Sequence, residues 1–286
     1  MAERLIADGV EAALGQRLLS ARPLGGGCIG EVYRAELENG MPVVAKVDRG
    51  GEPRLDREAY MLCYLRENSR LPVPEVYHSS PELLLMKLVE GTSSFSRGAE
   101  RHAAELVAAL HGVTAREYGH ERDTLIGSLD QPNPQTASWV EFFREHRLLY
   151  AARVACERRR LPEELYRRVG GLAEKLDGMI GESAPPALVH GDAWSANVLA
   201  QGDRVTAFLD PAIYHADPEI ELAYISLFNS FGGSFFEHYA ELRPIRPGFF
   251  EERRHLYALY PLLIHVYYFG GAYVDRVDAT LRRFGT

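Results

Sequence analysis

The 286-residue sequence has few cysteines, a deficit of positive charge and no long uninterrupted apolar run. Its three cysteines, Cys28, Cys63 and Cys156, are widely spaced, which excludes the paired spacings of a zinc site and a disulfide framework. Lysine and arginine total 32 against 40 acidic residues, so no basic surface is indicated for neutralising nucleic-acid phosphates. The composition predicts a protein of a reducing compartment that binds no nucleic acid.

No segment predicts a membrane span. Residues 1–14 carry charges throughout and lack the apolar core of a signal peptide. The most apolar late stretch, residues 256–269 (LYALYPLLIHVYYF), is short and contains Pro261 and His265. We therefore expect a cytoplasmic protein without a membrane partner, in which this stretch forms one or two buried helices.

The chain changes character near residue 91. Before it, residues 31–37 and 42–47 predict two strands joined by a hairpin turn at Asn39-Gly40. The other predicted elements of this part are a helix, a loop and an apolar strand, at residues 54–67, 71–80 and 82–91. After it, helical periodicity dominates over residues 101–113 and 138–160, the second helix beginning with Ser138 as its cap. The pattern is that of an α+β chain with a strand-rich and a helix-rich part.

A glycine-rich stretch precedes the first hairpin. Gly25, Gly27 and Gly30 with Val32 fit the pattern G-x-G-x-x-G-x-V, in which glycines let backbone N–H groups approach phosphates without a Cβ clash. The same glycines begin a dinucleotide fingerprint, but that site needs a helix directly after them. Here a β-hairpin follows, as in the loop that covers ATP phosphates in protein kinases. A plain glycine-rich turn between strands is the alternative.

Lys46 and Glu58 are a candidate ion pair. Lys46 lies within VVAKV on the second strand of the hairpin. Glu58 lies between Leu55 and Leu62 on the apolar side of the predicted helix, where a carboxylate is costly unless paired. A strand lysine paired with a helix glutamate positions the α- and β-phosphates in kinases. The alternatives are a lysine at a strand edge and a glutamate that reaches solvent.

Residues 188–200 (LVHGDAWSANVLA) have the spacing H-x-D-x-x-x-x-N of the kinase catalytic loop. Asp192 is the candidate base for an attacking hydroxyl. Asn197 offers a neutral oxygen ligand for a metal that bridges phosphoryl oxygens. We expect His190 to brace the loop by hydrogen bonding, and the apolar residues on either side to form two short strands.

A second metal ligand follows in residues 204–214 (RVTAFLDPAIY), which predict a strand ending at Asp210. This carboxylate would bind Mg²⁺ in contact with the β- and γ-phosphates of ATP. The next two residues are Pro and Ala rather than the Phe and Gly of protein kinases, and a simple Asp-Pro turn is the alternative. Asp217 and Pro218 predict the start of a helix beneath the catalytic loop.

Together these motifs resemble the fructosamine-3-kinase (ketosamine-3-kinase) family, a branch of the aminoglycoside and choline kinase-like enzymes. The stretches that carry the resemblance are GGGCI, YGHERDTLIGSLDQPNP followed by WVEFFREHRLL, HGDAWSAN and DPAIYHADPEIELA. They run from about Leu24 to Ala223, and FGGAY near the C-terminus is also similar. Ala193 and Ala196 stand where the family has Leu and Gly, and these departures bear on the shape of the acceptor pocket.

The resemblance implies a two-lobed protein kinase-like fold, with residues 1–90 as the ATP-covering lobe and residues 91–286 as the catalytic and acceptor-binding lobe. It implies ATP and Mg²⁺ as cofactors and phosphorylation of the 3-hydroxyl of a ketosamine, free or protein-bound. The nucleotide would contact the glycine loop, the strand lysine and the backbone of the hinge 86–88, that is Gly25, Gly26, Gly27, Cys28, Gly30, Val32, Lys46, Met86 and Leu88.

Two further residues have alternative interpretations. Trp194 follows the candidate base by two residues, so its ring is a candidate wall of the sugar pocket, or else part of the core. Cys28 lies in the glycine loop beside a candidate anion site, where N–H dipoles favour a thiolate. That position predicts an oxidant-sensitive activity and a redox-sensitive dimer in place of a monomer. A small loop residue without redox chemistry is the alternative.

Two other functions fit parts of the pattern. One is a different small-molecule kinase, acting on choline or on an aminoglycoside, for which an acidic acceptor pocket is expected. The other is a nucleotide-binding pseudokinase that serves as a scaffold. The second is disfavoured because the residues that pseudokinases usually lose are all present, namely Lys46, Asp192, Asn197 and Asp210.

Overall fold

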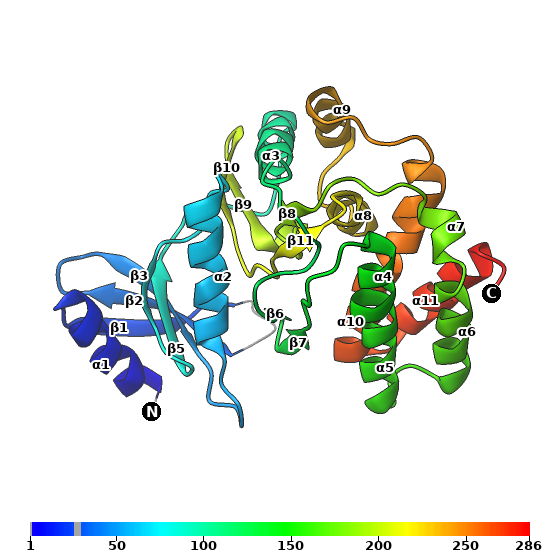
Figure 1. Ribbon diagram of the computed structural model, residues 1–286. Coiled ribbons are helices and arrows are strands. Elements are labelled where there is room, and N and C mark those ends of the chain that lie inside the picture. The colour runs from blue at the N-terminus through cyan, green and yellow to red at the C-terminus, as the bar shows by residue number, and fades with distance from the viewer. Residues whose placement is uncertain (1, 26–29) are drawn as a thin grey trace.

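The computed structural model describes residues 2–25 and 30–286. The first part is an antiparallel five-stranded sheet, seen on the left of Figure 1, in the order β1-β2-β3-β5-β4. Two helices accompany it, α1 (Ala2–Leu14) and α2 (Leu55–Asn68). The strands are β1 (Leu18–Pro23), β2 (Glu31–Leu37), β3 (Pro42–Val47), β4 (Val76–Ser79) and β5 (Leu83–Lys87).

The two helices cover opposite faces of this sheet. Ile6 and Val10 of α1 pack in one buried cluster with Leu83 and Leu85. The apolar side of α2 packs in another cluster with Leu84 of the same strand, β5. Because successive side chains of a strand point to opposite faces, the alternation along β5 places α1 and α2 on either side. The sheet is therefore buried on both faces.

The predicted strands at residues 31–37 and 42–47 are confirmed as β2 and β3, and the predicted helix as α2. The expected turn is present: Gly40 has φ = 80°, and its N–H donates to the Leu37 carbonyl at 2.9 Å. The expectation of a loop over residues 71–80 is wrong, because β4 pairs with β5 there. Pairing across the sheet gives this short segment hydrogen bonds that its own sequence does not indicate.

The second part is mainly helical and is shown on the right of Figure 1. Its helices are α3 (Arg97–Leu110), α4 (Trp139–Phe143), α5 (Tyr150–Glu157), α6 (Glu163–Ala173), α7 (Leu176–Ile180), α8 (Glu219–Leu227), α9 (Gly233–Leu242), α10 (Arg254–Phe269) and α11 (Ala272–Arg283). Three two-stranded pairs lie among them, formed by β6 (Thr124–Ile126) with β7 (Leu129–Gln131), β8 (Ala187–Val189) with β11 (Tyr214–Ala216), and β9 (Val198–Gln201) with β10 (Arg204–Phe208).

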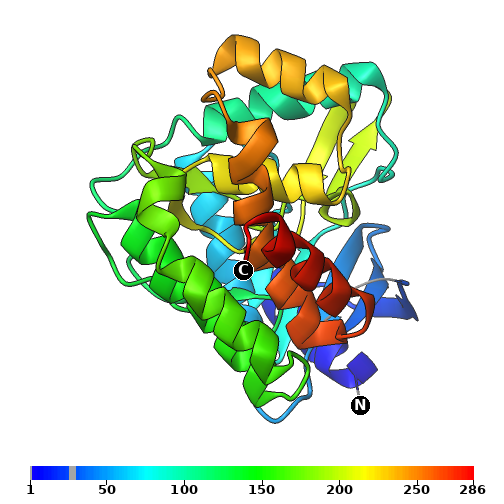
Figure 2. The same ribbon diagram turned by 90° about the vertical axis from the view of Figure 1, so that its right-hand side faces the viewer.

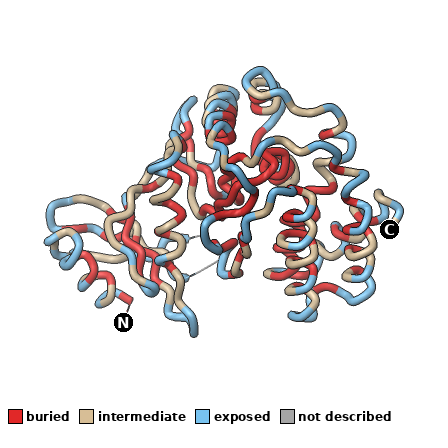
Figure 3. The backbone as a smooth tube through the Cα atoms, viewed as in Figure 1, coloured by how far each residue is buried: buried red, intermediate tan, exposed pale blue. Residues whose placement is uncertain are grey.

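Helix α10 is the centre of this part. It packs against α5, α8 and α11, and its residues from Leu256 to Tyr267 are all buried. Figure 2 shows this helix in orange beside α11 in red, and Figure 3 shows buried segments in red within the second part. The apolar stretch 256–269 is thus a single helix that contains Pro261. Within the described ranges, no helix combines the length and the apolar character that crossing a bilayer requires.

The helix predicted over residues 138–160 begins as expected. Ser138 Oγ accepts a hydrogen bond from the Glu141 N–H at 3.3 Å. The segment then departs from a regular α-helix, because a π-helical turn, Arg144–Leu149, separates α4 from α5. Such turns insert a residue into the helix and rotate the faces of the two halves relative to each other.

A buried network of acidic and basic side chains fixes the start of α8. Asp217 and Glu219 are almost completely buried. Arg246 donates to Asp217 Oδ2 and Glu219 Oε2, each at 2.8 Å, and Arg253 donates to Glu219 Oε2 at 2.6 Å. Asp217 Oδ1 also accepts from the Glu219 N–H at 3.0 Å. The helix was expected with Asp217 as its N-cap and Pro218 as its first residue. It begins one residue later, at Glu219 with Pro218 at the cap position, although Asp217 does bond the first helical N–H.

Removal of Arg246 should leave the buried Asp217 without its main counter-charge. We expect Arg246→Leu to lower the free energy of unfolding by about 2–4 kcal/mol, since an uncompensated buried carboxylate is costly and Arg246 itself is partly exposed. Chemical denaturation of variant and wild type measures this. Arg153→Leu, which removes an exposed pair with Glu157, is the control and should cost less than about 1 kcal/mol.

The loss of stability in Arg246→Leu should depend on pH. Burial raises the pKa of Asp217 to about 6, and Arg246 opposes that rise. Without Arg246 the pKa of Asp217 in the folded state rises further. The folded protein then binds the Asp217 proton more tightly than the unfolded chain does over a wider pH range. Stability is then lost as the pH rises through that higher pKa. The difference between variant and wild type should widen from pH 6 to pH 8, and a constant difference would contradict this account.

Candidate active site

Lys46 is the centre of a cluster of three charges. Its Nζ lies 2.6 Å from Glu58 Oε1 on α2 and in direct contact with Asp210 Oδ1, which follows β10. Burial lowers the pKa of Lys46, but the two carboxylates outweigh burial and the pKa stands above its ordinary value. The lysine is therefore charged, and its ammonium group joins the two parts of the chain.

The catalytic-loop residues form a second group. The loop follows β8, and Asn197 closes it just before β9, so both expected flanking strands are present. Asn197 Nδ2 donates to Asp192 Oδ2 at 2.7 Å and to the Asp192 carbonyl at 3.1 Å. Burial raises the pKa of Asp192 to about 8, helped by the charge of Asp210 and opposed by a hydrogen bond from Tyr224. A carboxyl group with this pKa takes up a proton readily near neutral pH.

The segment that carries Asp210 is fastened to the loop. The Ala212 N–H donates to the His190 carbonyl and the Leu209 N–H to the Asn197 carbonyl, each at 2.8 Å. Asp210 itself has φ = 51°, a left-handed conformation that is rare for a residue with a Cβ. This backbone strain is concentrated at the residue that contacts Lys46.

His190 is fully buried, and burial lowers the pKa of its imidazole, so the ring is neutral. Its Nδ1 accepts from the Asp192 N–H at 3.3 Å, and its ring lies 5.6 Å from that of Phe208. The imidazole thus contacts the loop from inside the core through Nδ1, and its bracing role stays a prediction.

Glu221, which the sequence interpretation missed, lies beneath the loop. This buried carboxylate of α8 accepts from the N–H groups of His190 at 3.2 Å and Gly191 at 2.8 Å. His111, which follows α3, contacts the same carboxylate, with Nε2 2.9 Å from Oε2. The available signal was an acidic residue within the apolar helical run EIELAYISL, where a charge needs a partner.

The glycine loop is described only at its two ends. Gly26, Gly27 and Cys28 lie outside the described residues, so the expectations for them remain predictions. Gly30 has φ = 69°, and a Cβ there would lie 2.7 Å from the Val47 carbonyl oxygen. The Leu24 N–H donates to the Val32 carbonyl at 2.8 Å, and Val32 is paired with Lys46. The two ends of the loop therefore converge beside the strand lysine, with Gly25 following Leu24.

The expected hinge lies at the end of β5. Met86 is buried and Leu88 is half-buried. The Lys87 N–H donates to the Glu75 carbonyl at 2.8 Å, so this donor is already used within the sheet. Adenine recognition in this segment would fall to the backbone of Met86 or Leu88.

Trp194 is half-buried and belongs to an aromatic cluster on the second part. Its ring centroid lies 5.4 Å from that of Phe228 and 6.4 Å from that of His265. His265 extends the cluster to Phe269 at 5.8 Å and Tyr273 at 4.8 Å, and Phe269 is 53% exposed. One edge of the indole thus packs on neighbours while part of it stays open, so the tryptophan is not a simple core residue.

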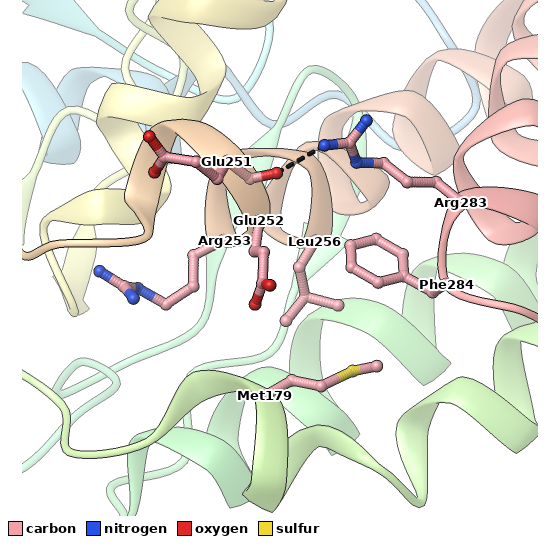
Figure 4. A pocket seen from close by; sticks show the side chains of 7 residues that line it. All are labelled: Met179, Glu251, Glu252, Arg253, Leu256, Arg283 and Phe284. Atoms are coloured by element: carbon pink, nitrogen blue, oxygen red, sulfur yellow. Dashed lines mark hydrogen bonds between the residues drawn. The ribbon is translucent and has the colours of Figure 1, made fainter.

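One hollow of the second part lies away from the candidate residues. A hollow of about 390 Å³ lies between α7, α11 and the start of α10 (Figure 4) and contains none of the candidate residues. Among the described residues, no group of three or more His, Cys, Asp and Glu side chains is arranged to hold a metal. Asp210 and Asn197 still suit Mg²⁺, which binds through one or two protein oxygens together with water and phosphate.

Comparisons with solved structures agree with this architecture. A candidate fructosamine-3-kinase from Thermobifida fusca has a TM-score of 0.85 and 31% sequence identity, over 97% of this chain and 98% of that one. An aminoglycoside phosphotransferase in complex with ADP and hygromycin B has a TM-score of 0.68 at 17% identity, over 98% and 97% of the two chains, which shows a shared fold. The fold and the clustered charges define a kinase-like phosphotransferase.

Sequence comparisons identify the family. The family model described as fructosamine kinase matches residues 3–285. The chain is 32% identical to a protein named probable ketoamine kinase in Synechocystis, over 97% of this chain and 95% of that one. It is also 32% identical to the chloroplastic protein-ribulosamine 3-kinase of Oryza sativa subsp. indica, over 90% and 76%. The chain belongs to the fructosamine kinase family.

Gly191 should not tolerate a side chain. Its φ is 83°, and a Cβ would lie 2.0 Å from the Ala212 carbonyl oxygen. We expect Gly191→Ala to push the loop away from the segment of Asp210 and to reduce phosphotransfer at least about 10²-fold, as displacements of about 1 Å can. Gly202 is a matched control: its φ is 59° with open space around it, so Gly202→Ala should cost about 1 kcal/mol of stability and leave turnover intact. Equal turnover in the two variants would contradict this prediction.

Proposed function

We propose that the protein transfers the γ-phosphoryl group of ATP to the 3-hydroxyl of a ketosamine, a sugar joined to an amine. The observation that carries the proposal is the convergence of Lys46, Glu58, Asp210 and the Asp192–Asn197 pair around the paired strands of the second part. Relatives named ketoamine kinase and protein-ribulosamine 3-kinase support the acceptor class. The acceptor is a small molecule or a protein that carries the adduct.

The nucleotide would lie between the two parts. We assign residues 1–90 to a lobe that covers ATP and residues 91–286 to a lobe that carries the catalytic loop and the acceptor. Lys46, held by Glu58, would neutralise the α- and β-phosphates. The glycine loop would contribute backbone N–H groups from the segment 25–30, with Val32 beside the adenine and the hinge at Met86 and Leu88.

Asp210 and Asn197 would hold Mg²⁺, which supplies charge neutralisation to the phosphates when bound. The carboxylate of Asp210 is 40% exposed, so it is open to a ligand. Asn197 donates through Nδ2 to Asp192, and its Oδ1 accepts no hydrogen bond within the described part of the chain, which leaves this oxygen for a cation. The donor set, one carboxylate and one amide oxygen, is a small oxygen site of the kind that Mg²⁺ occupies with phosphate.

Asp192 would orient the acceptor and take its proton. The 3-hydroxyl would donate its hydrogen to the carboxylate. As its oxygen forms a bond to the γ-phosphorus, the bond from that phosphorus to the bridging oxygen breaks, ADP leaves and the proton passes to Asp192. The raised pKa of Asp192 suits this transfer because proton affinity near the working pH favours general base catalysis. Trp194 and the aromatic cluster behind it offer a face for the C–H side of the sugar.

We place the enzyme in the cytoplasm, since Cys63 and Cys156 are free thiols and a reducing compartment keeps them so. It would act as a monomer, with an oxidised dimer formed through Cys28 as the redox-sensitive alternative. Oxidant treatment of wild type and Cys28→Ala, followed by size measurement, separates these states.

Substitution of the base and the metal ligand tests the chemistry. We expect Asp192→Ala to lower kcat by about 10²–10⁴, the usual contribution of a general base, while ATP still binds. Asp210→Ala should abolish Mg²⁺-dependent turnover. Asp203→Ala is the control, because that carboxylate contacts the Ser96 hydroxyl on the surface and should leave turnover unchanged. Near-normal turnover in Asp192→Ala or Asp210→Ala would refute the assignment of these two carboxylates.

The acceptor can be identified directly. ADP release should be measured with fructosamines, ribulosamines and erythrulosamines, and with choline and kanamycin as competing acceptor classes. We expect turnover with the ketosamines and little with the other two, and phosphorus NMR of the product should locate the phosphate on the sugar 3-oxygen. A phosphate elsewhere, or turnover only with the aminoglycoside, would overturn the acceptor assignment and leave phosphotransfer standing.

A further inference from the structure

Helix α2, which carries Glu58, is held by a segment of the second part that the proposed chemistry does not use. The segment comprises residues 118–131 and includes the β6–β7 hairpin, which lies beside α2 in Figure 1. At the start of the helix, the NH1 groups of Arg54 and Arg57 lie 2.8 and 2.7 Å from Asp130 Oδ1. One carboxylate of the hairpin thus holds the residues just before Glu58.

A second attachment lies just beyond Glu58. The Tyr60 hydroxyl donates to Glu121 Oε1 at 2.7 Å, and the same hydroxyl lies 2.8 Å from His120 Nε2. The Arg122 guanidinium lies 4.0 Å from the centroid of the Tyr60 ring. The first two turns of α2 are therefore attached on both sides of Glu58 along the chain.

The opposite side of the same segment contacts the residues that follow Asp210. Gln131 Nε2 donates to the Ala212 carbonyl at 3.0 Å, and Thr124 Oγ1 donates to the Ile213 carbonyl at 3.1 Å. The backbones of Gly119 and His215 exchange two hydrogen bonds, at 2.9 and 2.8 Å. Residues 118–131 thus connect, through short bonds, the two elements whose carboxylates meet at Lys46.

We propose that residues 118–131 form a clamp that fixes the positions of Glu58 and Asp210 relative to each other, and that Asp130 and Tyr60 are positioning residues for the nucleotide. The inference rests on the proposed role of Lys46 in binding ATP. Neither Asp130 nor Tyr60 contacts Lys46, so both act through α2. The clamp keeps the lysine between its two carboxylates before any nucleotide arrives.

The connection before α2 explains why such a clamp is needed. Residues 48–54 join β3 to the helix and include the adjacent glycines Gly50 and Gly51, both exposed. Arg54 stands at the helix cap position and makes no side-chain cap bond. Glycine leaves the backbone free to adopt many conformations, so this connection alone cannot set the rotation of α2. The contacts of α2 with Asp130 and Glu121 can set this rotation.

The test is a double-mutant cycle with Glu58. Asp130→Asn removes the charge that holds both arginines, and Tyr60→Phe removes the shared hydroxyl, each with little change of shape. We expect the combined variant to lower kcat/KM for ATP by roughly tenfold, the equivalent of about 1.4 kcal/mol. Partly exposed ion pairs contribute little singly, so each single variant should lose only a few-fold.

The decisive arm uses the background Glu58→Gln. If the clamp acts through Glu58, adding Asp130→Asn and Tyr60→Phe to that background should change kcat/KM for ATP by less than about twofold. A purely structural role would instead give the same tenfold loss in both backgrounds. Asp278→Asn is the matched control, because Asp278 also pairs with two arginines, Arg168 and Arg282, between α11 and α6; it should leave kcat/KM unchanged.

The outcomes separate the clamp from the function on which it rests. An undiminished kcat/KM in the combined variant, or equal losses with and without Glu58, would overturn the clamp alone. Wild-type turnover in Glu58→Gln would overturn the proposed role of Glu58 in holding Lys46, and with it the clamp. Thermal unfolding accompanies each assay, and the single variant Asp130→Asn gives the same comparison should the combined variant prove unstable.

Discussion

The positive charge of Lys46 is the constraint on which the rest of the site depends. An ammonium group withdrawn from water is costly unless carboxylates contact it. One of its two carboxylates, Glu58, comes from the neighbouring helix α2. The other, Asp210, lies 164 positions after Lys46 in the sequence. Glu58 compensates this charge within the first part, and the second carboxylate is added only when the two parts are docked.

In the second part, a buried negative charge on Glu221 is compensated in the same way. Burial raises the pKa of Glu221, but His111 and the N–H groups of the catalytic loop outweigh it, and the pKa is lowered. The carboxylate is therefore charged within the core and attracts the backbone donors of His190 and Gly191. The carboxylate of Glu221 thus holds the backbone of the loop at His190 and Gly191, which would otherwise be free to change conformation.

Features that depend on residues close together in the sequence could be predicted from it. The turn at Asn39-Gly40, the strands around it and the spacing from His190 to Asn197 are all local patterns, and the structure confirms the strands and the turn. Strand β4 could not be predicted because its segment follows two prolines and its bonding partner, β5, comes later in the chain. The π-helical turn after Phe143 was missed because such turns are rare and a regular α-helix is the ordinary expectation for a helical pattern. The partners of Glu221 directly follow β8 and α3, and no local pattern reveals that these segments meet.

The pairing of β8 with β11 limits how this sequence can diverge. Residues 190–213 form a backbone loop closed at its base by the pairs Val189–Tyr214 and Ala187–Ala216 and fastened across its middle by the bonds at Leu209 and Ala212. One residue gained or lost inside it would turn alternate side chains to the other face of the strands. Over evolutionary time we expect insertions and deletions to be tolerated in the surface connections between α8 and α10 and at the turn Gly202–Asp203. The remainder of the loop should keep its length even where its residues change.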